Sequence, residues 1–387
     1  MKKLLIIFFG LTIFITTRYV PLGSLSVLAN ISLILIPVIY FLYHKNNIKK
    51  KDFIFFIFII LWTNLLFFYS IIFCGNDFIL ALRFFIIVNL ILAAYFIKLP
   101  IIILKFLFYC VALQCLFLFL FEIILMFNLI NISPSDIRYF FKLQEWGDVY
   151  SYNNFFYKIQ LKGNALIPFV LFLSLLKINM IRNINIFRII FFAGLIISGN
   201  FAYILGLAFF LFFYNFSNIT INQFHRNVII LFTLIIIFSF PVADYLDNQI
   251  SMKKDVSLAV RKDQVNVLTN NLTEKPFNFL FGKGIGNTIN VKTAFRDYTD
   301  DIYFELQPLY FINQMGAVNF SVFLFLNVIF FLKKMRLKSI KIVYLSYIIY
   351  AVTNPYILDT NHVIVIISLI TLDNYLRNDN RMYSSTL

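Results

Sequence analysis

Three alternating glycines mark the stretch of this chain that is best suited to hold a ligand. In FLFGKGIGNT, Gly282, Gly284 and Gly286 surround Lys283 directly after a short apolar run. Glycine permits positive φ angles and close backbone approach, so clustered N–H groups can face an anion. The spacing matches neither a dinucleotide fingerprint nor a Walker loop. The motif predicts a backbone anion site, and an ordinary tight turn is the alternative.

An arginine precedes this loop in the segment SLAVRKDQVNVLTNN. The spacing of its valines and leucine predicts an amphipathic helix that lies on a membrane surface, with Arg261 near its start. A guanidinium group offers permanently charged, bidentate donation to phosphate oxygens. Arg261 is therefore a candidate catalytic residue, and a solvated basic pair with Lys262 is the alternative.

A carboxylate and two amides follow the loop, in DYTDDIYFELQPLYFINQMGAV. Pro308 suits the first turn of a helix, which places Glu305 just before that helix. An acid at this position complements the helix dipole. In the functional interpretation, Glu305 is a catalytic base or a carboxylate that positions an acceptor hydroxyl. Gln307 and Gln314 offer amides to sugar hydroxyls, although Gln314 also fits inside a helix bundle.

A shorter polar segment, residues 131–164, is rich in Tyr, Trp and Asn. This mixture fits sugar recognition and an interfacial aromatic belt equally well. Glu122 lies within an apolar run and is a functional candidate by default, with a protonated structural carboxyl as the alternative. His362 is the one histidine near the predicted outer boundary, so the sequence supports neither a zinc site nor a Ser–His–Asp triad.

The composition is that of a membrane protein. Of 387 residues, 61% are hydrophobic and 13% are charged, against about 45–50% and about 25% in soluble domains. The net charge of +15 comes from clusters of Lys and Arg between apolar runs, as the positive-inside rule requires. No nucleic-acid partner is therefore expected. The three cysteines lie in apolar segments without metal-ligand spacing, so no metal site is expected.

Apolar runs near the length of about 20 residues that spans a bilayer predict about twelve transmembrane helices. They are 4–20, 23–43, 53–74, 78–97, 101–127, 165–177, two short helices within 189–214 that meet at SGN (198–200), 228–242, 308–332, 342–358 and 363–372. With alternating spans, the basic segments and both termini share the cytoplasmic side. The predicted fold is an all-α integral membrane protein, a single domain over residues 1–387. Two loops, 131–164 and 243–307, face outward, and the larger is partly helical.

The order of these motifs resembles that of the O-antigen polymerase and ligase superfamily, which assembles bacterial surface polysaccharide from lipid-linked repeats. Arg261 opens the large loop, KPFNFLFGKGIGN supplies its glycine turn, and ELQPLYFINQMGAV enters a span. VTNPYILDTN (352–361) is similar to the family's penultimate span, and KGNALIP (162–168) to its return from the shorter loop. The resemblance covers the chain from near Asn131 onward.

Two departures from the family pattern bear on function. Asn200 stands where the family often carries an arginine, and the missing phosphate contact would fall to Lys158, Lys162, Lys283 or Arg296. The ligases of the superfamily usually place a histidine where this chain reads IYFELQ. Its absence favours a polymerase over a ligase.

The resemblance implies a polymerase that transfers a growing glycan from undecaprenyl diphosphate onto a lipid-linked repeat, at the periplasmic face of the bacterial inner membrane. Arg261, Lys283, Arg296 and the glycine amides would stabilise the leaving diphosphate. Glu305 would orient or deprotonate the acceptor, and further substrate contacts would come from Lys162, Asn164 and Gln307. No cofactor is expected, because the lipid diphosphate is the leaving group.

The sequence leaves partners and alternatives open. A chain-length regulator protein is one candidate partner, beside the lipid-linked oligosaccharide and the membrane lipid. The alternative functions are an O-antigen ligase and a flippase or transporter of lipid-linked sugar. Transporters place charges around a midplane site, whereas the predicted spans carry few, namely Arg83, Lys105 and Glu122.

Overall fold

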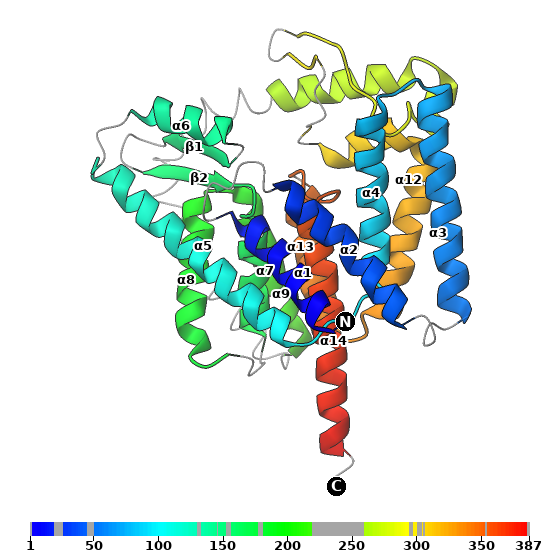
Figure 1. Ribbon diagram of the computed structural model, residues 1–387. Helices are drawn as coiled ribbons and strands as arrows, with labels where there is room; N and C mark the ends of the chain where they lie inside the picture. Colours follow the sequence, from blue (N-terminus) through cyan, green and yellow to red (C-terminus); the bar gives the residue numbers. More distant parts are fainter. Residues whose placement is uncertain are drawn as a thin grey trace.

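The computed structural model describes most of the chain. The described residues are 2–18, 26–44, 50–129, 133–144, 146–151, 156–176, 181–218, 259–293, 297–299, 304, 306–352 and 354–384. They form a bundle of helices with two smaller substructures at one end (Figure 1).

A helix occupies every predicted span that falls within the described residues. These helices are α1 (Lys2–Thr17), α2 (Ser26–His44), α3 (Lys50–Phe68), α4 (Phe78–Ala94), α5 (Ile102–Met126), α7 (Leu166–Leu175), α8 (Ile184–Ser198), α9 (Phe201–Asn218), α12 (Gln307–Lys334), α13 (Lys338–Val352) and α14 (Thr360–Ser384). The predicted span 228–242 lies outside the described residues. Three helical segments, Asp52–Phe73, Ile102–Met126 and Gln307–Lys334, are long and apolar enough to cross a membrane. Because several other helices are short, the count of twelve spans stays a prediction.

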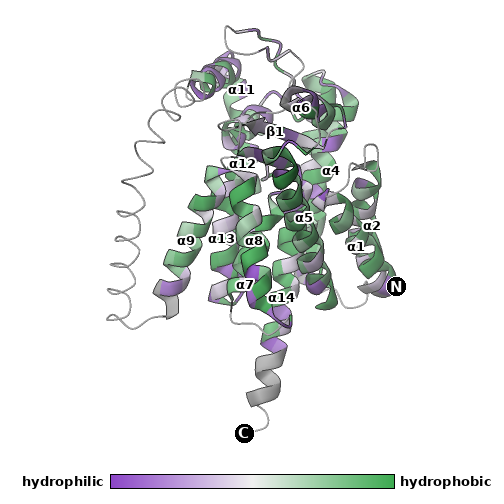
Figure 2. Cartoon of the chain, turned by 90° about the vertical axis from the view of Figure 1, so that its left-hand side faces the viewer, coloured by the Kyte–Doolittle hydropathy of each residue, from purple (hydrophilic) through white to green (hydrophobic). Residues whose placement is uncertain are grey.

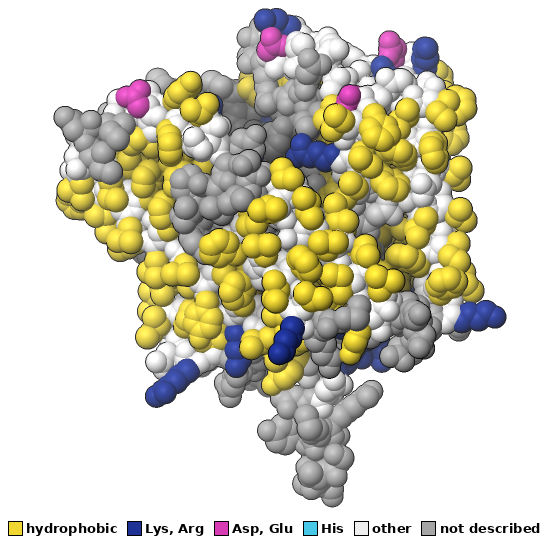
Figure 3. Space-filling view, viewed as in Figure 1, with side chains coloured by type: hydrophobic (Ala, Val, Ile, Leu, Met, Phe, Trp, Pro, Cys, Tyr) yellow, Lys and Arg dark blue, Asp and Glu magenta, His cyan; other side chains and the backbone are white. Residues whose placement is uncertain are grey.

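The bundle buries one apolar stripe of each long helix and exposes another. On α5, Leu107, Val111 and Leu118 are buried, whereas Tyr109, Leu113, Leu116 and Leu120 are exposed at helical spacing. Figure 2 shows apolar residues over most of the helical body, and Figure 3 shows exposed hydrophobic side chains across its middle. A soluble protein rarely exposes so large an apolar surface, and lipid would cover it. The chain is therefore a helical protein of membrane character.

Basic residues hold one end of the bundle together. Lys334, at the end of α12, forms an ion pair with Asp52 of α3 (Nζ–Oδ1 2.9 Å). Asp373 of α14 accepts hydrogen bonds from the backbone N–H groups of Arg336 and Leu337. The positive-inside rule predicts that this end is cytoplasmic. The two polar loops lie at the other end (Figure 1).

The shorter loop is not purely helical. It contains α6 (Pro134–Leu143) and an antiparallel hairpin of β1 (Gly147–Ser151) and β2 (Tyr157–Leu161). The Oγ of Ser133 caps α6 by accepting from the Asp136 N–H. Alternate residues of β2 are buried, as expected for a strand with one covered face. The prediction of an all-α fold holds for the bundle and is wrong for this loop.

The larger loop builds a small core of its own. A helix over residues 259–273 and the short α11 (Pro276–Phe281) frame it. Its buried members are Val267, Leu268, Ile289, Tyr298, Phe304, Tyr310 and Phe311, the last two from α12. The predicted amphipathic helix is confirmed, but its apolar side packs on this core.

Candidate functional site

The glycine loop is packed against two helices and a turn. Gly282, Gly284 and Gly286 have φ angles of 80°, 83° and 83°, which favour glycine over all other residues. A Cβ on Gly282 would lie 2.4 Å from the carbonyl oxygen of Gln314, and one on Gly286 would lie 2.5 Å from the Ala81 nitrogen. The glycines are therefore needed for close backbone approach, whatever the loop binds.

Most of the loop's polar groups already have protein partners. The N–H groups of four of its residues donate within the described chain: Gly282 to Asn278 O, Lys283 to Asn313 O, Ile285 to Ser70 Oγ and Asn287 to Gln314 Oε1. Ser70 belongs to η3 (Tyr69–Phe73), a π-helical turn that extends α3. These four amides are engaged, so the predicted anion site rests on Gly284, Gly286 and the Lys283 side chain.

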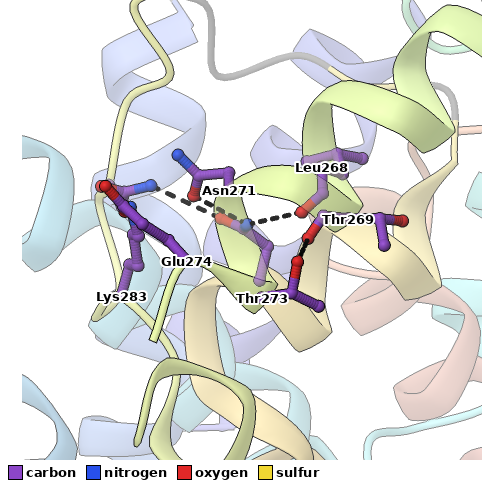
Figure 4. A network of polar contacts seen from close by, with 8 residues as sticks. Leu268, Thr269, Asn271, Thr273, Glu274 and Lys283 are labelled. Atoms are coloured by element: carbon purple, nitrogen blue, oxygen red, sulfur yellow. Dashed lines mark hydrogen bonds and ion pairs between the residues drawn. The ribbon is translucent and has the colours of Figure 1, made fainter. Parts of the chain in front are cut away.

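Lys283 contributes a positive charge beside an acid. Its ammonium group forms an ion pair with the exposed carboxylate of Glu274, and the two side chains face each other in Figure 4. The hydrogen bond and charge of Lys283 hold the pKa of Glu274 below its usual value. A phosphate would have to compete with this carboxylate for Lys283.

Two neighbouring residues of α12 join the loop to the helix over 259–273. Asn313 donates to Leu268 O (3.3 Å) and to Asn271 Oδ1 (2.9 Å). Gln314 both accepts from the Asn287 N–H and donates to the Asn287 carbonyl. Gln314 is buried, and its amide holds the backbone of the glycine loop at Asn287. Apart from its amide side chain, nothing in the sequence marked Asn313 as a residue of this site.

Arg261 lies on the exposed side of the helix over 259–273. Two turns along, Val267 and Leu268 enter the small core of the large loop, which also contacts Ile357 and Leu358 from the turn after α13. The structure thus places the helix that carries Arg261 over that turn. Glu305 and Arg296, predicted to act with Arg261, lie outside the described residues.

Of the remaining predicted contacts, Gln307 and Asn164 are buried and Lys162 is exposed. Gln307 donates to the Phe304 carbonyl (2.9 Å). Asn164 accepts from Gln114 Nε2 (2.9 Å) and donates to the Ile159 carbonyl (2.9 Å). These bonds give both amides a structural role. Lys162 stands where the shorter loop returns to the bundle.

The return of the shorter loop meets the outer ends of α1 and α14. A Cβ on Gly163 would lie 2.2 Å from the carbonyl oxygen of Thr16, which shows how closely the turn approaches α1. Asn361, at the start of α14, donates to the Lys162 carbonyl (3.5 Å). Arg18, which follows α1, accepts from the Trp146 indole through its carbonyl. Lys162 and Arg18 therefore both lie at the outer ends of α1 and α14.

The turn between α13 and α14, residues 354–359, lies beside that place and is partly exposed along its whole length. Asn200 ties it to the break between α8 and α9: its Nδ2 donates to Asn354 Oδ1 (2.9 Å), and its Oδ1 caps α9 at the Ala202 N–H. Tyr203 donates to the Tyr356 hydroxyl (3.0 Å). Asn200 therefore stabilises the contact between this turn and the start of α9, and it does not take the role of a phosphate-binding arginine.

Asp359 is the last residue of the turn and its only acidic residue. Loss of water on burial holds the pKa of Asp359 above its usual value; hydrogen bonds from Asn361 and the Thr360 N–H and the positive charges of Arg18 and Arg83 act in the opposite direction and only partly offset burial. Arg83 lies on the exposed side of the second turn of α4. Neither Asp359 nor Arg18 was predicted from the sequence. The signal was an ionisable residue at the end of an apolar run, which marks functional sites in membranes.

The described residues contain no group of three His, Cys, Asp or Glu side chains that could hold a metal ion. No family model, curated protein or solved structure matches this chain. The functional argument therefore depends on the site itself.

Proposed function

We propose that this chain is a polysaccharide polymerase that transfers a growing glycan from undecaprenyl diphosphate onto a lipid-linked repeat unit. The proposal includes a setting in the bacterial inner membrane, about twelve spans in accordance with the hydropathy pattern, two periplasmic loops and cytoplasmic termini. The reaction needs three things from the protein: cations for the diphosphate, a polar surface for sugars and an apolar surface for the lipid.

One observation carries the proposal. Arg18 and Arg83 place positive charge near Asp359 and its partly exposed turn, at the end of the bundle opposite its basic rim. Guanidinium groups bind phosphate oxygens with bidentate geometry, and they stabilise the charge that develops on a departing diphosphate. A lipid-linked diphosphate sugar fits such a place, because its head is anionic and its tail needs an apolar wall.

The surroundings of the turn suit the other parts of this substrate. The Tyr356 hydroxyl accepts from Tyr203 and keeps its own O–H group to donate to a sugar oxygen. The exposed apolar stripes of α3 and α5 suit contact with a polyprenyl chain as well as with bilayer lipid. Arg261 reaches the outer side of the same region on its own helix, and Lys283 and Arg296 supply further positive charge in the large loop.

The experiment compares two neighbouring basic residues on one exposed helix face. In a strain that lacks the gene, plasmids carry the wild type, Arg261→Ala or Lys262→Ala, and surface glycan is separated on a gel. We expect Arg261→Ala to abolish long chains while single repeats still appear, and Lys262→Ala to leave chain length unchanged. Normal chain length in Arg261→Ala, with protein present at the wild-type level in the membrane, would refute the assignment.

The deletion strain itself separates the two alternatives. A ligase would leave the lipid acceptor without any glycan, not with one repeat. A flippase or transporter would leave repeats on the cytoplasmic side, where an impermeant labelling reagent does not reach them.

A further inference from the structure

Asp359 belongs to a partly exposed turn that adjoins a fully buried stretch of α14. Residues 354–359 are partly exposed, whereas residues 361–372 of α14 are buried one after another. Asp359 lies fourteen residues before Asp373 of α14, which is about 21 Å along a helix that rises about 1.5 Å per residue. The turn therefore lies far from the basic end, on the side where the two loops stand.

The other described carboxylates at this end each have a partner in the fold, and Asp359 differs from them in having a raised pKa together with two nearby arginines. Asp77 caps α4 through the Leu80 N–H, Asp136 bonds Ser133 at the start of α6, Asp148 pairs with Arg138, Asp263 accepts from Thr293 and Tyr298, Glu274 pairs with Lys283, Asp297 pairs with Lys292, and Glu122 is buried against the Tyr157 N–H. Asp359 combines partial exposure with the charges of two arginines.

Both oxygens of Asp359 retain room for another donor. Oδ1 accepts from the Thr360 N–H (2.7 Å) and Oδ2 accepts from Asn361 Nδ2. Each carboxylate oxygen has two lone pairs, so each can take a second hydrogen bond. Asp359 directly precedes α14 and stands at its N-cap position, where its backbone carbonyl accepts from the His362 N–H; asparagine and serine suit this position as well.

A buried acceptor beside Asp359 lacks a donor. Asn361 is 2% exposed, and within the described part of the chain its Oδ1 receives no hydrogen bond. Buried polar atoms are nearly always satisfied, so an orphaned acceptor calls for a partner. The unpartnered Oδ1 belongs to the same amide whose Nδ2 donates to Asp359, so a ligand hydroxyl that donates to it would lie close to the carboxylate.

We propose that Asp359 is a catalytic residue that takes the proton from the acceptor hydroxyl in the transfer reaction. The inference rests on the proposed polymerase function. The acceptor oxygen forms a bond to the anomeric carbon of the donor glycan while its O–H proton passes to a carboxylate oxygen of Asp359. The bond from that carbon to the diphosphate oxygen breaks, and its electron pair leaves with undecaprenyl diphosphate.

The two arginines fit both halves of this step. Before transfer, Arg18 and Arg83 favour the ionised form of Asp359, the form that accepts a proton. As Asp359 becomes neutral, negative charge accumulates on the leaving diphosphate, and the same guanidinium groups are then free to stabilise it. Glu305 keeps the other role that the sequence allows, that of orienting the acceptor.

The test separates proton transfer from capping. Purified wild type and Asp359→Asn are mixed with lipid-linked repeats extracted from the deletion strain, and binding, polymer formation and thermal stability are measured. Asn keeps the cap and cannot accept the proton. We expect binding within about twofold of the wild type and turnover lower by about 100-fold or more, the scale of general base catalysis.

Asp77→Asn is the matched control, because Asp77 likewise stands at a helix N-cap at this end, where its side chain accepts from the Leu80 N–H. It should leave turnover and binding unchanged. Asp359→Ser is the second variant, since serine caps as well and carries no carboxylate. Turnover within about threefold of the wild type in both Asp359 variants would overturn the proposal, as would loss of turnover in Glu305→Gln with Asp359→Asn active.

Two further outcomes are also decisive. If neither Asp359 variant reaches wild-type thermal stability, Asp359 is a structural cap and the proposal is overturned. If the wild type itself makes no polymer from the extracted repeats, the polymerase function fails. Loss of turnover confined to the Asp359 variants leaves that function intact and supports the inference.

Discussion

Gly282 is the position where a single methyl group should do most damage to the fold. Its backbone has φ 80° and ψ 175°, a region that essentially glycine alone occupies and that costs other residues about 1–3 kcal/mol. A Cβ would also lie 2.4 Å from the Gln314 oxygen and 2.4 Å from the Gly316 nitrogen. Such overpacking adds about 1–3 kcal/mol. Gly282→Ala should therefore lower the free energy of unfolding by about 2–6 kcal/mol.

Gly75 provides the matched control. It has a positive φ of 66°, but nothing lies within 4 Å of a Cβ added there. Gly75→Ala should thus show only the cost of the left-handed conformation, about 1–2 kcal/mol, with no packing contribution. The difference between the two variants reports mainly the close approach of the glycine loop to α12, beside a smaller difference in backbone conformational cost.

The assay is unfolding by SDS titration in mixed detergent micelles, followed by tryptophan fluorescence for the wild type and the two variants. We expect Gly282→Ala to unfold at clearly lower SDS than Gly75→Ala. A difference below about 0.5 kcal/mol between them, the usual size of surface effects, would refute the packing argument. It would also show that the loop moves away from Gln314 and Gly316 without cost.

Two further predictions concern the shorter loop and its return. Asn164→Ala removes the acceptor of Gln114 Nε2 inside the bundle and should cost about 1–3 kcal/mol, so that long glycan falls only in proportion to folded protein. A larger loss of glycan would instead show that Asn164 touches substrate. Burial raises the pKa of Asp148, but the hydrogen bond and charge of Arg138 act in the opposite direction, and the pKa lies below its usual value. The pair should therefore stabilise the hairpin above the unfolded-state pKa of about 3.9 and lose this effect as pH falls through the folded pKa. Arg138→Gln should remove this acid sensitivity, which hydrogen exchange of β1 and β2 measures.

Much of the helical bundle was predictable, because its signal is local. Apolar length and the interruption SGN at 198–200 fixed the helices, including the break between α8 and α9. The hairpin was not predicted, since the aromatic residues around it fit an interfacial belt as well as a strand. The buried alternation of Tyr157, Ile159 and Leu161 was its one local cue.

The candidate site was less predictable, because it is made by contacts between distant segments. The glycine loop was identified from its composition, but its partners Ser70, Asn76 and Asn313 come from two other helices and a turn. Asp359 and Arg18 are far apart in the chain, and their meeting depends on how α1 and α14 pack. Sequence spacing carries no information on such a pair.

The loop and the turn are mechanically connected. The backbone of α12 departs from helical geometry at Gly316 (φ 73°, ψ 167°), and Gly282 packs into that break. The loop core held there also contacts Ile357 and Leu358, directly before Asp359. A displaced glycine loop should therefore shift the turn as well as the helix that carries Arg261. Because a displacement of about 1 Å can cost about 100-fold in rate, the glycines matter to the proposed reaction through position, even where their amides bind no anion.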